Sequence, residues 1–191
     1  MKLLEERIRK DGKVYDGDVL KVDGFLNHQI DVAFVCELGK EFHRLFGNCG
    51  VNKILTVEAS GIGVACLTAQ YFGCPVVFAK KAKTSNMGPE CWTAQAHSYT
   101  HGTDNTLTVS KLYLGKEDKV LIVDDFLANG CAANAMVKLC EQAGAAVVGI
   151  GAVIEKAYQK GGDSLRQAGF RVESLARVAS MSPKDGVRFC E

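Results

Sequence analysis

The sequence lacks three features that would each define a class of protein: an excess of charge of one sign, a long apolar run and closely paired cysteines. Lysine and arginine number 23 and aspartate and glutamate 22, which leaves a formal net charge of +1. The charge excess typical of proteins that bind nucleic acid or anionic membranes is therefore missing, and we expect small-molecule ligands instead.

No stretch approaches the roughly 20 apolar residues of a membrane-spanning helix. Residues 1–10 are charged and amphipathic, unlike the apolar core of a signal peptide. The eight cysteines are scattered without a Cys-x-x-Cys pair, which favours reduced, mostly structural thiols. We therefore expect a cytoplasmic protein with no membrane or nucleic-acid partner.

The length of 191 residues suits one domain with a sizeable core, and the chain has no internal repeat or low-complexity tract. Apolar runs and helical periodicity alternate, which predicts an α/β fold with a doubly wound, mostly parallel sheet. We expect a single domain over 1–191, in which 1–30 contribute a helix and a small amino-terminal flap. Strands are predicted at Lys53 to Val57, Val76 to Ala79, Val120 to Val123, Val147 to Ile154 and Arg171 to Ala179, and helices at Met1 to Lys10, Ile30 to Phe46, Gly61 to Tyr71, Ala132 to Ala143 and Asp163 to Ala168.

Periodicity lapses from Lys80 to Thr106, a segment rich in Thr, Ser, His and Asn. A structureless loop of this length is uncommon in a compact domain and is often functional. We expect residues 80–110 to form a long, mobile lid loop, with an excursion strand near its base between Thr106 and Leu114.

An acidic pair, Asp124 and Asp125, follows the apolar run Val120 to Val123, which predicts a strand buried on both faces. The small residues after it, Ala128 to Ala132, lead into a helix whose free N–H groups favour an anion. The carboxylates can take ligand hydroxyls, or a metal carried by the ligand. This layout indicates a cradle for a phosphorylated sugar; the alternative is a solvated turn that caps the helix.

The segment Glu58 to Gly61 repeats this strand-loop-helix layout one unit earlier. Lys80 and Lys81 follow the next strand, and a lysine there could neutralise a phosphate. We assign Lys81 a phosphate contact, with solvated lysines and a plain tight turn at Gly61 to Gly63 as the alternatives.

The run from Val120 to Ala132 resembles the phosphoribosyl-pyrophosphate signature of type I phosphoribosyltransferases, and the resemblance covers essentially the whole chain. It implies that the acidic pair holds the 2' and 3' ribose hydroxyls and has a catalytic role. By the same resemblance the 5'-phosphate lies on Ala128, Asn129, Gly130, Cys131 and Ala132, and the pyrophosphate on a loop of unusual peptide conformation formed by Glu58, Ala59, Ser60 and Gly61. Cys131 departs from the Thr or Ser that is common there, so main-chain donors must hold the phosphate.

Within the family the chain is similar to bacterial members that use xanthine, through Leu20 as apolar cover, Asn27 as an amide partner and Lys156 as a cation for ring carbonyls. The resemblance implies transfer of the phosphoribosyl group to xanthine, Mg²⁺ bound mainly through phosphoribosyl pyrophosphate rather than protein side chains, and a homodimer. Hypoxanthine or guanine as acceptor remains open, as does a non-catalytic regulator that senses phosphoribosyl pyrophosphate. No separate helix-turn-helix domain is evident to support the regulator.

Overall fold

A six-stranded sheet forms the centre of the molecule in the computed structural model, which describes residues 1–81, 90–98 and 103–190. The strand order is β10-β9-β8-β7-β3-β4; all neighbouring pairs are parallel except β9 and β10. The predicted doubly wound, mostly parallel sheet is thereby confirmed. Its strands are β3 (Lys53–Val57), β4 (Val76–Ala79), β7 (Lys119–Leu127), β8 (Ala146–Lys156), β9 (Val172–Ser182) and β10 (Gly186–Phe189).

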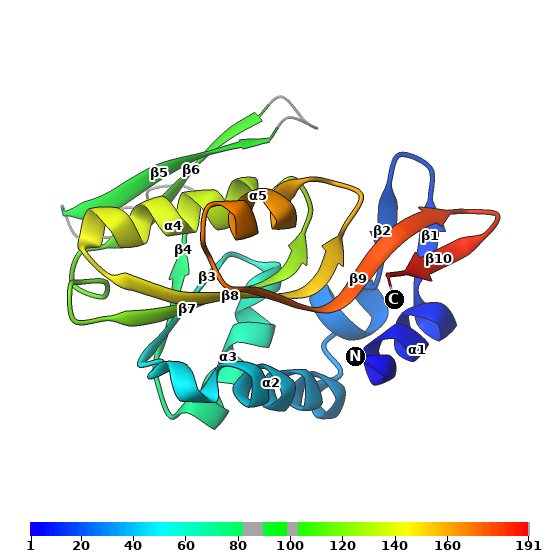
Figure 1. Ribbon diagram of the computed structural model, residues 1–191, viewed down its shortest axis with the longest axis horizontal. Helices are drawn as coiled ribbons and strands as arrows, with labels where there is room; N and C mark the ends of the chain where they lie inside the picture. The colour runs from blue at the N-terminus through cyan, green and yellow to red at the C-terminus, as the bar shows by residue number, and fades with distance from the viewer. Residues whose placement is uncertain (82–89, 99–102, 191) are drawn as a thin grey trace.

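Helices cover both faces of this sheet (Figure 1). Helices α2 and α3 lie against one face, and α4 and α5 lie against the other. Strand β7 shows why both faces need cover, since Leu121 and Val123 belong to one hydrophobic cluster while Val120 and Ile122 belong to the second. The helices are α1 (Lys2–Asp11), α2 (Val32–Phe46), α3 (Ser60–Phe72), α4 (Cys131–Ala143) and α5 (Gly161–Gln167), with a π-helical turn η1 (Asp23–Asn27) and a 3-10 turn η2 (Gly47–Cys49).

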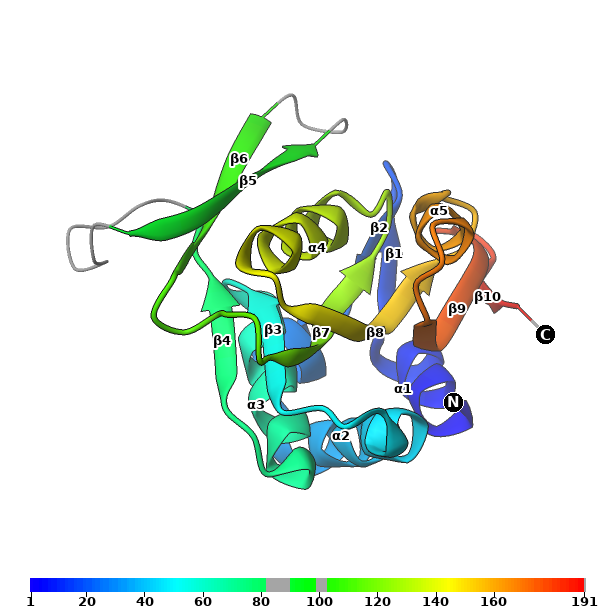
Figure 2. The same cartoon turned by 60° about the vertical axis from the view of Figure 1, so that its left-hand side comes forward.

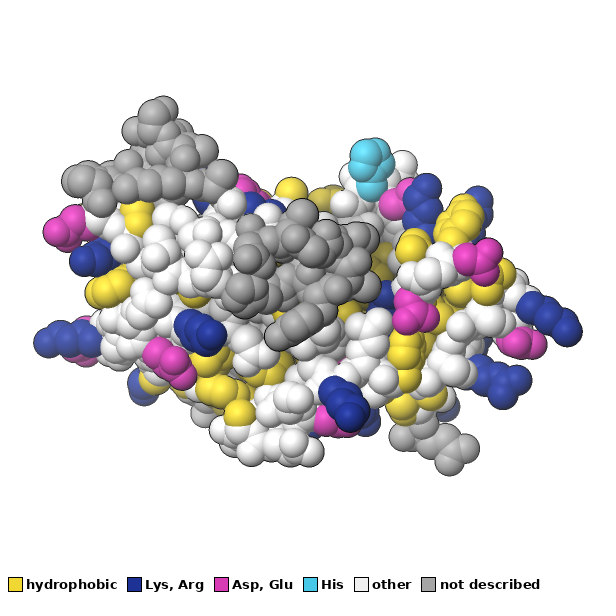
Figure 3. Space-filling view, turned by 90° about the horizontal axis from the view of Figure 1, so that it is seen from above, with side chains coloured by type: hydrophobic (Ala, Val, Ile, Leu, Met, Phe, Trp, Pro, Cys, Tyr) yellow, Lys and Arg dark blue, Asp and Glu magenta, His cyan; other side chains and the backbone are white. Residues whose placement is uncertain are grey.

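Two hairpins extend from the layered body. The first, β1 (Lys13–Tyr15) with β2 (Val19–Lys21), forms the predicted amino-terminal flap and packs near β9 and β10. The second, β5 (Cys91–Ser98) with β6 (Thr103–Ser110), lies beside α4 at the other end of the sheet (Figures 1 and 2). Among the side chains described on the face in Figure 3, basic and acidic groups are interspersed.

Three sequence predictions were wrong. The segment from Lys80 to Thr106 was predicted to lack structure, but it contains β5 and the start of β6; residues 82–89 and 99–102 lie outside the described part. Residues 111–113 form a turn instead of extending an excursion strand. Strand β7 was predicted to end before the acidic pair, whereas it continues through Asp124 and Asp125 to Leu127 because its pairing with β8 extends to Glu155.

Candidate active site

The acidic pair lies in the second half of β7, toward the edge where the parallel strands end. Asp125 is only 9% exposed, and its Oδ1 accepts a hydrogen bond from the Phe126 N–H at 3.0 Å. Asp124 Oδ1 accepts from the Asp125 N–H, also at 3.0 Å. The two carboxylates are therefore oriented by the strand's own backbone before any ligand binds.

Electrostatics make the Asp124 carboxyl costly to ionise. Burial raises the pKa of the Asp124 carboxyl well above its usual range, the adjacent Asp125 charge raises it further, and Lys81 partly opposes both. Native proteins place such unfavourable charge where a ligand offsets it. Hydroxyl donors or a cationic group in the cleft would relieve this repulsion.

The predicted phosphate loop connects β7 to α4. Gly130 adopts a left-handed φ of +83° immediately before α4, a conformation that glycine tolerates best. The helix begins at Cys131, one residue earlier than predicted, so Cys131 and Ala132 lie in its first turn. The Cys131 N–H donates to Asn129 Oδ1 at 3.1 Å, so a bound phosphate would compete with the Asn129 side chain for this amide.

A glycine that sequence reasoning missed, Gly161, packs against the backbone of the phosphate loop and does not line the cleft. The Gly161 N–H donates to the Ala128 carbonyl at 3.2 Å. A Cβ on Gly161 would lie 2.3 Å from the Ala128 carbonyl oxygen and 2.5 Å from the Gly130 nitrogen. Only the Gly-Gly pair at the start of α5 signalled this close approach in the sequence.

The predicted pyrophosphate loop connects β3 to α3, and the peptide bond between Glu58 and Ala59 is cis. Glu58 Oε1 accepts from the Lys81 N–H at 2.6 Å, which joins this loop to the segment that follows β4. A Cβ on Gly61 would lie 2.1 Å from Thr56 Oγ1 and 3.0 Å from Asp124 Oδ1. Gly61 thus allows the loop to pass directly beside the acidic pair.

Both loops and the acidic pair line one cleft of about 260 Å³. The structure therefore brings together residues predicted from two separate strand ends. One wall was not predicted, because it comes from the β5–β6 hairpin. The full lining is Val57, Glu58, Ser60, Gly61, Lys81, Ala96, Asn105, Leu107, Asp124, Asp125, Asn129, Cys131 and Ala132.

A second cavity of about 620 Å³ lies between the β1–β2 flap and the end of β8. It contains two of the three predicted base-binding residues, Leu20 and Lys156. Lys156 Nζ donates to the Asp18 carbonyl at 2.5 Å, and burial lowers the pKa of Lys156 below 10.5. The lining is Gly17, Asp18, Val19, Leu20, Phe126, Ala128, Lys156 and Gln159.

Asn27 takes a different place from the other two predicted base-binding residues. It lines neither of these cavities in the described part of the chain, and its Nδ2 donates to Asp125 Oδ2 at 2.9 Å. The contact spans 98 residues of sequence, and nothing in the local sequence pattern indicated it.

A buried ion pair stabilises the segment beyond Lys156. Arg166 holds the 1%-exposed Glu155 with two hydrogen bonds of 2.8 and 2.7 Å, and Arg177 lies 3.3 Å away. Burial is the largest single influence and would raise the pKa of Glu155, but the hydrogen bonds from Arg166 and Ser174 and the charges of Arg166 and Arg177 together outweigh it, so the pKa is lowered. The pair fastens α5, and with it Gly161, to the end of β8.

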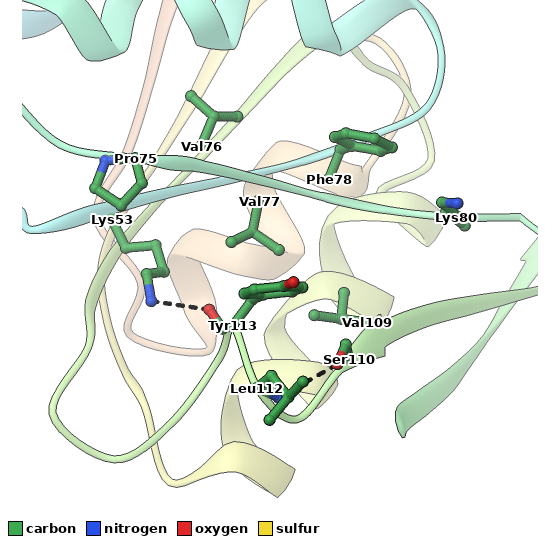
Figure 4. A pocket seen from close by; sticks show the side chains of 10 residues that line it. All are labelled: Lys53, Pro75, Val76, Val77, Phe78, Lys80, Val109, Ser110, Leu112 and Tyr113. Carbon is green, nitrogen blue, oxygen red and sulfur yellow. Dashed lines mark hydrogen bonds between the residues drawn. The ribbon is translucent and has the colours of Figure 1, made fainter. Parts of the chain in front are cut away.

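A third cavity, of about 540 Å³, follows the edge strand β4 (Figure 4). Its walls are mainly apolar, and Lys53 Nζ donates to the Tyr113 carbonyl at 2.8 Å. Leu112 is 82% and Tyr113 61% exposed. The lining is Lys53, Pro75, Val76, Val77, Phe78, Lys80, Val109, Ser110, Leu112 and Tyr113.

Helices long and apolar enough to cross a membrane do not occur in the described ranges. Across the same residues, no group of three or more His, Cys, Asp or Glu side chains is arranged to hold a metal ion.

Solved structures share this fold. Adenine phosphoribosyltransferase from Trypanosoma brucei superposes with a TM-score of 0.77 at 19% identity, over 91% of this chain and 79% of that one. The enzyme of the same name from Rhodothermus marinus gives a TM-score of 0.73 at 21% identity, over 93% of this chain and 99% of that one. At these identities the likeness concerns the fold alone.

Sequence relatives are much closer. The chain is 54% identical to the xanthine phosphoribosyltransferase of Lachnoclostridium phytofermentans, over 97% of this chain and 96% of that protein. It is 51% identical to the xanthine phosphoribosyltransferase of Bifidobacterium longum subsp. infantis, over 97% of each. Residues 26–166 match the family model for the phosphoribosyl transferase domain. With its strand-end cleft, its fold and these relatives in agreement, the chain belongs to the phosphoribosyltransferase family.

Proposed function

We propose that the protein transfers the 5-phosphoribosyl group from phosphoribosyl pyrophosphate to xanthine, giving xanthosine 5'-monophosphate and pyrophosphate. The observation that carries this proposal is the cleft in which the acidic pair, the phosphate loop and the pyrophosphate loop meet. Relatives more than 50% identical over nearly the full chain carry the xanthine phosphoribosyltransferase name, which supports the choice of base.

The chemical groups of the donor match the residues that line the cleft. Asp124 and Asp125 would accept the 2' and 3' ribose hydroxyls, and the N–H groups at the start of α4 would bind the 5'-phosphate. The amides of Ala59, Ser60 and Gly61 with Lys81 would bind the pyrophosphate. As the bond between the sugar carbon and pyrophosphate breaks, the acidic pair would stabilise positive charge on the ribose while Lys81 stabilises the leaving group.

The base would occupy the second cavity, whose lining residues Phe126 and Ala128 lie in sequence between Asp125 and Asn129 of the donor cleft. Leu20, 6% exposed, provides an apolar cover from the flap. Lys156 would leave the Asp18 carbonyl to face a ring carbonyl of the purine. Xanthine carries two such carbonyls and ionises easily, so a buried cation favours it over adenine. The ring nitrogen then forms the glycosidic bond and its proton is lost to solvent.

Mg²⁺ fits this proposal as an ion carried by the donor. Magnesium usually keeps several waters and uses substrate phosphate oxygens in preference to a cage of protein side chains. It would neutralise pyrophosphate charge, while the aspartates remain with the ribose hydroxyls. Titration of the donor with and without Mg²⁺ tests this, and equal affinity in both would contradict it.

We further propose that two copies of the chain associate through the cavity along β4. This surface combines the edge strand of the sheet with exposed apolar side chains, which single chains rarely leave in contact with water. Light scattering should give twice the mass of one chain for the wild type. Leu112→Glu should reduce the measured mass to that of one chain, because it places a charge on the apolar surface. Leu112 is 82% exposed, so its replacement leaves the core intact. A dimeric variant would exclude this surface.

The reaction is proposed to take place in the cytoplasm, where thiols stay reduced. The free thiols of all eight cysteines support this placement.

The assay that tests the function offers phosphoribosyl pyrophosphate, Mg²⁺ and one purine at a time to the purified protein. Chromatography then measures nucleotide formation. We expect kcat/KM for xanthine to exceed that for hypoxanthine and guanine by at least about 10-fold. Preference for another purine would change the substrate, and donor binding without turnover would indicate a sensor instead of an enzyme.

A further inference from the structure

Asn27 occupies a place that a residue used only to recognise the base would not need. Its side-chain amide reaches the acidic pair, where Nδ2 donates to Asp125 Oδ2 at 2.9 Å. The orientation of the amide follows from chemistry, since an ionised carboxylate can only accept hydrogen bonds and the amide must offer its NH₂ group. The other end of the amide, Asn27 Oδ1, can then accept a hydrogen bond from an N–H of the base.

The hydrogen bond completes the support of Asp125. Asp125 Oδ1 is held by the Phe126 N–H, and Oδ2 is held by Asn27. With both oxygens bonded, the plane of this largely buried carboxylate is set, and each oxygen still has a lone pair for a ribose hydroxyl. Loss of Asn27 would leave Oδ2 without this donor, beside a second carboxyl whose pKa is already raised.

The segment that presents Asn27 is itself firmly anchored. Phe25 and Leu26 in η1 are fully buried, and the ring of Phe25 packs edge-on against Phe34 at 5.5 Å. The Arg7 guanidinium lies over both rings, at 5.0 and 5.2 Å from their centroids, and donates to Asp31 at 2.9 Å. Asn27 therefore approaches Asp125 from a fixed direction.

We propose that Asn27 is a positioning residue for Asp125, and that it ties the amino-terminal base-covering segment to the ribose end of the donor site. This rests on the proposed function, because it assumes that Asp125 holds the ribose. If Asn27 positions Asp125, it contributes to donor binding even when no base is present. A residue that contacts only the base would not do so.

Calorimetric titration of phosphoribosyl pyrophosphate and Mg²⁺ into the protein, without any purine, tests the proposal. We expect Asn27→Leu to raise the donor Kd by about 10-fold to 100-fold, which corresponds to one hydrogen bond to a charged group. In steady-state assays kcat/KM for the donor should fall as the Kd rises. If the leucine variant does not fold, Asn27→Ser shortens the side chain with less disturbance.

Gln29→Ala is the matched control, since it also removes a side-chain amide from this segment. Gln29 Nε2 donates to the Gly24 carbonyl at 3.1 Å and does not touch the acidic pair. The control should bind the donor within about 2-fold of wild type. An equal loss of donor affinity in both variants would mean that Asn27 only stabilises the segment in general. A rise in xanthine KM alone would mean that Asn27 contacts the base and does not position Asp125. Either result overturns the proposal. Failure of the wild type to bind the donor would instead refute the proposed function.

Discussion

Gly161→Ala is the substitution that most directly tests whether the loop from Ala128 to Ala132 binds phosphate. Gly161 lies outside the cleft, so its replacement removes no group that could touch a ligand. The added methyl group would approach three backbone atoms of the loop, the Ala128 oxygen at 2.3 Å and the Asn129 carbon and Gly130 nitrogen at 2.5 Å each. Backbone atoms cannot rotate away, so the loop itself must move.

The size of that movement follows from the distances. Ordinary contact begins at 3.4 Å, so the 2.3 Å approach must open by 1.1 Å. A displacement of about 1 Å in a positioned group can cost about 100-fold in rate, and overpacking of this kind costs about 1–3 kcal/mol in stability. We expect kcat/KM for phosphoribosyl pyrophosphate to fall by about 10-fold to 100-fold, with a smaller effect on xanthine KM.

Donor titration and steady-state kinetics measure the effect, and urea unfolding measures the stability. Gly115→Ala is the control, because a Cβ there meets nothing within 4 Å. Wild-type donor affinity in Gly161→Ala, with the free energy of unfolding lowered as expected, would refute the reasoning. It would mean that the loop moves without consequence and is not the phosphate site.

Three further predictions concern charged groups. Lys156→Ala should raise xanthine KM much more than donor KM in steady-state assays. The affinity of the wild type for xanthine should also fall with rising pH. Burial lowers the pKa of Lys156 from 10.5, so Lys156 loses its charge at a lower pH than an exposed lysine does. Asp124→Asn should raise the Tm while kcat falls. A carboxyl with a raised native pKa, once ionised, costs the folded state about 1.4 kcal/mol for each pKa unit of the shift. An unchanged or lower Tm would contradict this prediction. Glu155→Gln should flatten the acid side of a Tm-against-pH curve. The lowered native pKa of Glu155 gives stability that is present above pH 4.5 and is lost as the pH falls through that native pKa. A curve parallel to that of the wild type would exclude Glu155 as the cause of the loss of stability in acid.

Much of the sheet could be predicted from local pattern. The runs Lys53–Val57 and Val76–Ala79 are short, apolar and bounded by turns, and both strands have the predicted ends. The β5–β6 hairpin was missed because small and polar residues such as Ala94, Ala96 and Asn105 carry little apolar signal. Ala94 and Leu107 are buried in a hydrophobic cluster with residues of α4, which lies against the hairpin. Such a contact between distant segments leaves no local periodicity to read.

The sequence alone determined that a buried strand, an acidic pair and a small-residue loop follow one another between Val120 and Ala132, since strand, turn and helix signals all act over a few neighbouring residues. It did not determine where the strand ends, because pairing with β8 carries β7 through the acidic pair to Leu127. Tertiary structure decided how that run becomes a site. It brought Gly61 beside Asp124, packed Gly161 against the phosphate loop and joined Asn27 to Asp125 across 98 residues of chain. These contacts depend on how the strands are ordered in the sheet, which is set by burial over the whole molecule and not by any single segment.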